Sequence, residues 1–120
     1  MKQYIVMRKD LRNKKGEKVR TGKLIGQASH GILNVFAREV RDKGFCSDIE
    51  EYLSGDYKKI VLGVNSEEEL VGLFELLVSE GVVVEMVEDL GLTEFNGKTK
   101  TCFVTGILEE CPLLEGVSLY

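Results

Sequence analysis

Residues 22–31 read Gly-Lys-Leu-Ile-Gly-Gln-Ala-Ser-His-Gly, and as a helix, at about 100° per residue, this stretch divides into two sides. One side carries a line of polar residues at helical spacing: Lys23, Gln27, His30 and Asn34. The other side carries apolar residues, which we expect to face the core: Ile25, Ala28, Ile32, Val35 and Phe36. Glycine costs a helix roughly 1 kcal/mol relative to alanine, so Gly26 and Gly31 suggest that another group approaches the backbone. A solvated helix face that happens to carry a histidine is the alternative interpretation.

The flanking sequence predicts where this helix begins and ends and what surrounds it. Thr21 is the expected cap, and the helix is expected to run to Lys43 and to stop at Gly44. A weaker segment, residues 46–56, predicts one short helix. Short apolar runs predict four strands, over residues 4–7, 60–64, 82–87 and 101–105.

A second long helix is expected after Ser66, which forms a capping box with Glu69, and its stop is expected at Gly81. No helix fits between the third and fourth strands, so these two are expected to be antiparallel. This order of elements predicts an α/β fold: a single domain over residues 1–120, with a mixed four-stranded sheet and helices packed on its faces. The tail, residues 111–120, is expected to lie on this domain.

Composition excludes several classes of protein. With 43% hydrophobic and 30% charged residues, the chain has the make-up of a globular protein. No apolar run approaches the roughly 20 residues that span a membrane, and the N-terminus lacks the layout of a signal peptide. Cys46, Cys102 and Cys111 lack metal-ligand spacing, so we expect no metal and three reduced thiols in a cytoplasmic protein. Cys102 is expected inside a strand, and the other two at the periphery.

The charge distribution points to an anionic partner despite a net charge of −4. Residues 8–23 hold eight of the sixteen basic residues and only two acidic ones, a local balance of +6. Such segregation creates a local positive field, and this segment runs directly into the polar line of the helix. The candidate phosphate contacts are Lys14, Lys15, Lys18 and Arg20. A flexible, solvated loop is the alternative.

A candidate site follows from where these groups meet the sheet, since ligands of open α/β sheets bind at the carboxyl ends of strands. If the first and third strands are parallel, the polar line shares an edge with Asp89 and Thr93, which follow the third strand. The edge then combines a lysine cation, a histidine base, a carboxylate to orient it and a hydroxyl. Equally, Asp89 could satisfy turn amides and Thr93 could cap a turn. No serine or cysteine nucleophile, phosphate loop or metal cluster is evident, which leaves water-mediated hydrolysis or pure binding.

Three segments resemble the type 2 peptidyl-tRNA hydrolases, the archaeal and eukaryotic form of that enzyme. Residues 22–30 are similar to the family's G-K-x-x-x-Q-x-S-H helix start, and residues 89–93 are similar to its D-x-G-x-T loop. Residues 101–106 are similar to its threonine strand that ends in glycine. The resemblance extends over nearly the whole chain. Two departures are a basic loop several residues longer than usual, and Gly31 in place of a common alanine.

The resemblance implies hydrolysis of the ester that joins a peptide to the terminal ribose of tRNA, a step that recycles tRNA and needs no cofactor. His30 or Asp89, or the two together, would activate water, and Lys23 would meet a phosphate or the developing oxyanion. Thr93 would supply a further hydrogen bond. The residues expected to bind substrate are Gln27, Asn34, Thr101, Lys14, Lys15, Lys18 and Arg20.

Two other functions remain open at this stage. One is a catalytically silent tRNA- or protein-binding module of the same fold, and the other is a small α/β interaction module with no RNA role. The joint presence of the catalytic candidates disfavours the first, and the +6 segment beside them disfavours the second. The sequence leaves the oligomeric state open, with a homodimer as one option.

Overall fold

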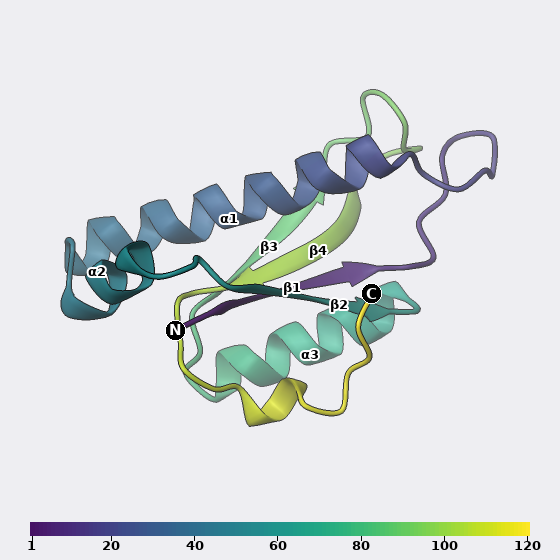
Figure 1. The fold of residues 1–120 in the computed structure, drawn as a ribbon. Helices are drawn as coiled ribbons and strands as arrows, with labels where there is room; N and C mark the ends of the chain where they lie inside the picture. The colour runs from purple at the N-terminus through teal and green to yellow at the C-terminus, as the bar shows by residue number, and fades with distance from the viewer.

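The computed structural model describes residues 1–120 and has one four-stranded sheet at its centre (Figure 1). β1 pairs with β2 in parallel, and β4 is antiparallel to both β1 and β3. The strands, in the spatial order β2-β1-β4-β3, are β1 (Gln3–Arg8), β2 (Lys59–Val64), β3 (Val84–Asp89) and β4 (Thr99–Thr105). The predicted mixed sheet and antiparallel last pair are confirmed. Since β1, β2 and β3 point the same way, their carboxyl ends lie at one edge.

Helices cover both faces of this sheet, so the predicted α/β class is confirmed. α1 (Thr21–Lys43) packs on β3 and β4, and α2 (Ser47–Ser54) follows at its carboxyl end. α3 (Glu67–Ser79) lies on the opposite face with a short 3-10 helix, η1 (Pro112–Leu114). Each of the three predicted helices is present. None of them combines the length and the apolar character that crossing a membrane requires.

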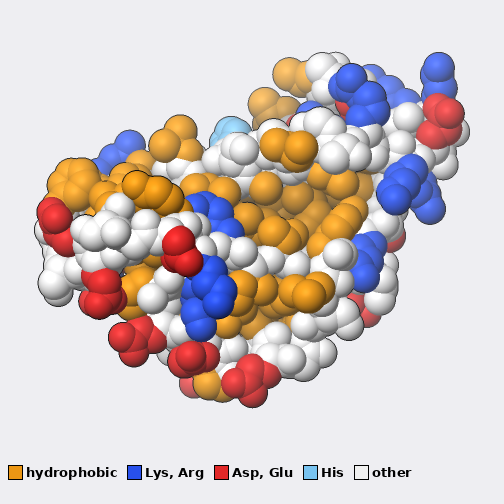
Figure 2. Space-filling model, viewed as in Figure 1, with side chains coloured by type: hydrophobic (Ala, Val, Ile, Leu, Met, Phe, Trp, Pro, Cys, Tyr) orange, Lys and Arg blue, Asp and Glu red, His pale blue; other side chains and the backbone are white.

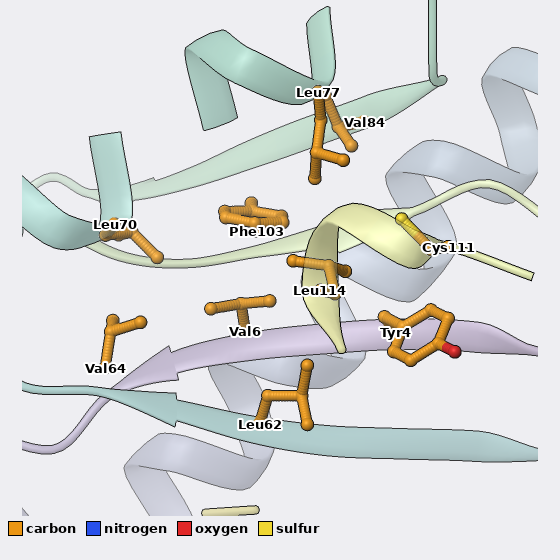
Figure 3. Packing of buried hydrophobic residues seen from close by; sticks show 10 residues of the cluster. All are labelled: Tyr4, Val6, Leu62, Val64, Leu70, Leu77, Val84, Phe103, Cys111 and Leu114. Carbon is orange, nitrogen blue, oxygen red and sulfur yellow. The ribbon is translucent and has the colours of Figure 1, made fainter. Parts of the chain in front are cut away.

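The larger part of the core fills the space between the sheet and α3 (Figure 3). Alternate residues of β1 and β2 point to that side, and Leu70 and Leu77 reach it from α3. Phe103 of β4 is completely buried there, with its ring centroid 6.0 Å from that of Phe74. Burying one large apolar side chain contributes about 1.5–3 kcal/mol, so this cluster is a main source of stability.

The buried side of α1 is the predicted one only in part: Val35 is buried, with Ala28 and Ile32 packed against the same cluster. Ile25 is 61% exposed, whereas the polar residues Gln27 and Glu39 are buried. Both polar side chains have partners on the sheet side: the Thr101 hydroxyl donates to Gln27 at 2.7 Å, and the Ile107 backbone N–H donates to Glu39 at 2.8 Å. Hydrophobic periodicity misses such positions, because it assigns polar residues to solvent even where the neighbouring element supplies hydrogen bonds.

Gly31 explains how close α1 comes to the sheet. A Cβ at this position would lie 2.6 Å from a methyl group of Val104 and 2.9 Å from one of Val87. The predicted close approach is therefore confirmed at Gly31, and the approaching group is the sheet itself. Gly26, by contrast, has no atom within 4 Å of the corresponding position.

The helix caps are partly as predicted. Thr21 is the first residue of α1, and Arg20 occupies the cap position without a side-chain cap bond, so the predicted Thr21 cap is wrong. The Ser66 cap is confirmed, since its hydroxyl accepts from the Glu69 backbone N–H at 3.1 Å. The Glu69 carboxylate accepts from the backbone N–H of Asn65 at 3.0 Å, one residue earlier than in a capping box.

The tail covers the outer edge of β2. Val61 in β2 is 41% exposed, because this strand lies at the edge and α1 covers β3 and β4 instead. The backbone N–H of Gly63 donates to Ser118 at 2.9 Å, and that of Tyr120 donates to Val61 at 3.0 Å. The predicted docking of the tail is confirmed, and it blocks further pairing along that part of the edge.

Candidate active site

A hollow of about 300 Å³ lies between the first half of α1 and the carboxyl end of β3. β1 and β3 are parallel, the condition on which the predicted site depended, and this direction brings the two segments to the same edge. The residues that line the hollow are Lys23, Gln27, His30, Val87, Glu88, Asp89, Leu90, Leu92 and Thr93. The four catalytic candidates therefore share one site.

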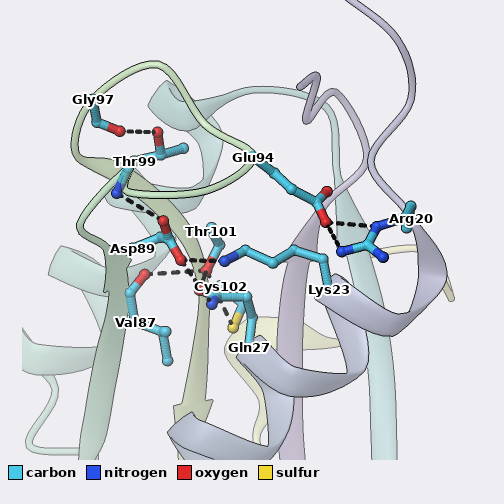
Figure 4. Close-up of polar contacts among 11 residues, drawn as sticks. Arg20, Lys23, Gln27, Val87, Asp89, Glu94, Gly97, Thr99, Thr101 and Cys102 are labelled. Carbon is cyan, nitrogen blue, oxygen red and sulfur yellow. Dashed lines mark hydrogen bonds and ion pairs between the residues drawn. The ribbon is translucent and has the colours of Figure 1, made fainter. Parts of the chain in front are cut away.

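A connected set of hydrogen bonds runs through the floor of this hollow (Figure 4). Asp89 Oδ2 accepts from Lys23 Nζ at 2.6 Å and from Gln27 Nε2 at 3.2 Å, and Asp89 Oδ1 accepts from the Gly91 backbone N–H at 2.8 Å. The Thr101 hydroxyl donates to Gln27 Oε1 at 2.7 Å. This last bond sets which end of the Gln27 amide faces Asp89, so a donor rather than an acceptor meets the carboxylate.

The environment keeps Asp89 ionised. Burial of the carboxyl group works to raise its pKa, but the hydrogen bonds from Lys23, Gly91 and Gln27 and the Lys23 charge outweigh it, and the pKa of Asp89 is lowered. The side chains of Lys23 and Asp89 are only 17% and 12% exposed. The site thus presents a fixed ion pair that is largely shielded from solvent.

His30 and Thr93 lie at the rim of the hollow, away from the ion pair on its floor. Both are exposed at the rim of the hollow, and neither side chain makes a hydrogen bond within the protein. The carboxylate that we expected to orient His30 is instead held by Lys23 and Gln27. Both rim side chains are free to contact a bound substrate.

The remaining candidates lie further away. Thr101 is completely buried beneath Gln27, which suits it to positioning that amide. Asn34 lies in a separate hollow of about 630 Å³ beside Arg38 and Arg41. Three of the basic candidates, Lys14, Lys15 and Lys18, are exposed on the segment before α1, whereas Arg20 is paired with Glu94.

Sequence reasoning missed several residues of the site. Leu90 and Leu92 are 62% and 79% exposed at the rim, where they offer apolar surface to a ligand. Phe95 is buried, and its ring centroid lies 5.6 Å from Lys23 Nζ, a cation–π contact. Glu88 adds a second carboxylate to the hollow. The sequence does show three apolar residues, Leu90, Leu92 and Phe95, in a short polar loop. It does not show which of these side chains point to the hollow and which to the core.

The cysteines lie outside the hollow. Cys102 is completely buried, and desolvation raises its pKa to about 11. Cys111 is also buried, with a pKa raised by burial, so its predicted peripheral position is wrong; it packs in the core beside Leu114 of η1. Only Cys46 is partly exposed.

We expect iodoacetamide at mildly alkaline pH to alkylate Cys46 in the native protein, and all three cysteines after denaturation, because a buried thiol forms little thiolate. Mass spectrometry of peptides measures this. Cys46→Ser should remove the native reaction and leave intact the ester hydrolysis that the family resemblance implies. A folded Cys46→Ser variant without activity would indicate a covalent thioester route and would contradict water as the nucleophile.

The fold and the hollow define a small α/β protein with a largely shielded lysine–aspartate pair at the carboxyl edge of a mixed sheet. The chain belongs to the family Peptidyl-tRNA hydrolase PTH2, whose profile matches residues 1–111. The peptidyl-tRNA hydrolase of Methanopyrus kandleri is 39% identical over 105 residues, which cover 88% of this chain and 83% of that protein. The peptidyl-tRNA hydrolase of Haloquadratum walsbyi is 38% identical over 106 residues, covering 88% and 85%. The peptidyl-tRNA hydrolase of Methanocaldococcus jannaschii is 32% identical, with the same coverage.

Proposed function

We propose that this protein hydrolyses the ester bond of peptidyl-tRNA, releasing the peptide and a reusable tRNA. The observation that carries the proposal is the joining of Lys23, Gln27, Asp89 and Thr101, from distant segments of a chain in this family, into one hydrogen-bonded site. The proposed substrate has an anionic backbone and an ester that gains negative charge during attack. Both properties suit a site with a shielded cation.

In the proposed mechanism, water attacks the ester carbonyl carbon. The Lys23 ammonium group donates to the carbonyl oxygen as it becomes an oxyanion, and Asp89 holds that lysine in place. The water oxygen forms the new bond to carbon, and the proton it loses passes to Asp89 or to His30. When the carbon–oxygen bond to the ribose breaks, the base returns this proton to the leaving oxygen, which becomes the terminal hydroxyl group of tRNA. The peptide leaves as a carboxylic acid, which then ionises.

Gln27 and Thr101 act by positioning. Because Thr101 fixes the Gln27 amide, its N–H group shares Asp89 Oδ2 with Lys23 and limits the rotation of the carboxylate. In this proposal, Thr93 and Leu92, which line the rim, contact the ester and the adjoining residue of the peptide. A fixed carboxylate and lysine need little rearrangement during the reaction, which is the condition for electrostatic catalysis.

The test of this function is the release of N-acetylated amino acid from acylated tRNA by the purified protein, compared with a buffer blank. We expect multiple turnovers in the absence of added metal or cofactor. A protein that binds the tRNA but releases nothing beyond the blank would be a silent binding module, and the proposal would be wrong.

The basic segment is the proposed contact for tRNA phosphates. Figure 2 shows Lys and Arg side chains gathered at the end of the molecule where residues 9–20 project. Lys14, Lys15 and Lys18 are exposed there and form no ion pair. The catalytic hollow opens beside the same end, so one RNA can reach both.

Replacing Lys14, Lys15 and Lys18 together by glutamine is expected to flatten the dependence of tRNA affinity on salt. Each lost phosphate contact lowers the slope of log affinity against log salt by about one unit, so we expect a reduction of about two to three units. Binding titrations at several salt concentrations measure the slope. A matched glutamine triple at Arg41, Lys43 and Lys58 serves as the control for net charge. Equal slopes in the two triples would mean that the basic segment does not bind RNA.

An enzyme that hydrolyses peptidyl-tRNA works where translation takes place. The proposed function therefore implies a cytoplasmic location. The expected homodimer is a separate proposal, and light scattering from the purified protein decides it.

A further inference from the structure

Residues 9–20 form a compact hairpin rather than a loose loop. Arg12 and Lys18 face each other in an antiparallel bridge. At the turn, the side-chain oxygen of Asn13 accepts from the backbone N–H groups of Lys15 at 2.9 Å and Glu17 at 3.0 Å. These bonds hold the basic tip in one shape before any RNA binds, which lowers the entropy cost of binding.

The base of this hairpin is shared with the loop that follows Asp89, residues 90–98. Leu11 and Val19 of the hairpin are buried in the same apolar cluster as Phe95 of the loop. The backbone N–H of Lys14 donates to the backbone oxygen of Glu94 at 2.9 Å. The hairpin and the loop therefore pack as neighbours, as Figure 1 shows at the first turn of α1.

A charged contact between Glu94 and Arg20 completes this junction (Figure 4). Glu94 Oε1 accepts from Arg20 Nε at 2.7 Å and also from Arg20 Nη2. The Glu94 side chain is only 14% exposed, and its other oxygen is buried without a partner. Burying a carboxylate is costly unless it is paired, so Arg20 is the group that allows Glu94 to remain inside.

We propose that Arg20 and Glu94 are positioning residues that join the basic hairpin to loop 90–98, so that RNA phosphate held at the hairpin tip steadies the catalytic loop. The inference rests on the proposed function and adds a role for Arg20 other than phosphate binding. Glu94 is flanked by Thr93 at the rim and by Phe95, whose ring contacts Lys23. Release of Glu94 to solvent therefore moves two groups that shape the site.

The first test uses a substrate too short to reach the hairpin, the N-acetylaminoacyl ester of a short oligonucleotide with the 3′-terminal tRNA sequence. We expect Arg20→Ala and Glu94→Ala to lower kcat about tenfold or more with little change in KM, because small misplacements of reacting groups are costly. Arg12→Ala removes the same charge from the same hairpin without touching Glu94, and it should keep wild-type kcat. Arg20→Lys should restore part of the loss.

The second test needs no hydrolysis. Hydrogen exchange of residues 90–98 is measured with and without a blunt RNA duplex, which has no single-stranded end to enter the hollow. We expect the duplex to slow exchange in the wild type and in Arg12→Ala, but not in Arg20→Ala. The proposal is overturned if the duplex does not slow hydrogen exchange of residues 90–98 in the wild type. It is also overturned if Arg20→Ala keeps both this slowing and the wild-type kcat. If the wild-type protein does not hydrolyse the ester at all, that result counts against the proposed function and not against this proposal.

Discussion

Asp89→Asn is expected to lower kcat for N-acetylaminoacyl-tRNA by about 100-fold or more while leaving the fold intact. Asparagine keeps the shape of the side chain but loses the charge that holds Lys23 at 2.6 Å. Its amide group also cannot accept on both sides, so the contact with either Gln27 or Gly91 is lost. Steady-state hydrolysis measures kcat. Since the variant leaves the shielded Lys23 ammonium group without its counter-charge, we also expect a lower thermal midpoint, and circular dichroism at the assay temperature checks that the variant is folded.

Glu88→Gln is the matched control for Asp89→Asn. Glu88 lines the same hollow and carries the same charge, but its side chain is exposed and forms no ion pair with Lys23. We expect Glu88→Gln to retain kcat within a few-fold. Loss of activity in both variants to the same degree would mean that the net charge of the hollow matters and the Lys23–Asp89 pair does not.

His30→Ala separates the two routes for the proton. Because the pKa of Asp89 is lowered, its carboxyl group is ionised throughout the neutral range, and it contributes no change in rate there. A pH–rate limb near neutrality that disappears in His30→Ala would identify His30 as the base. Full activity in both His30→Ala and Asp89→Asn would remove acid–base catalysis by these residues from the mechanism.

Gly91→Ala is expected to destabilise the protein by at least about 2 kcal/mol and to lower kcat at least about tenfold. The backbone at Gly91 has φ +79°, a conformation that L residues rarely adopt, and an added Cβ would come within 2.3 Å of the backbone oxygen of Gly97. The loop must open to relieve this clash. Opening displaces the Gly91 N–H group that binds Asp89, so stability and activity fall together.

Two alanine variants act as controls for Gly91→Ala, with stability measured by urea denaturation. Gly97→Ala has a similar left-handed backbone, with φ +95°, but open space around the new methyl group, so we expect a loss of only about 1 kcal/mol. Gly26→Ala lies on an exposed turn of α1 and should gain up to about 1 kcal/mol. If Gly91→Ala behaves like Gly97→Ala, the two sides of the loop do not pack as closely in solution.

The sequence by itself determined those helices and strands that depend on residues close together in the chain. Apolar runs predicted the four strands, although β3 and β4 begin two residues from the predicted positions, at Val84 and Thr99. Ser66 marked the start of α3 correctly, because a cap bond joins residues three positions apart and depends on nothing else. The sequence also indicated four residues of the hollow, Lys23, His30, Asp89 and Thr93, on the condition that β1 and β3 are parallel, but it missed Glu88, Leu90 and Leu92.

Only the tertiary structure decided which partners those residues have. The polar line of α1 reads as a solvent-facing stripe, yet Gln27 is buried because Thr101 and Asp89, both more than sixty residues away, complete its hydrogen bonds. Asp89 pairs with Lys23, whereas His30, further along the same helix, makes no hydrogen bond to it. The basic segment likewise gives no sequence signal for its contact with Glu94. Hydrogen bonds and ion pairs between distant segments depend on distances that only the packed chain defines, so periodicity and composition cannot predict them.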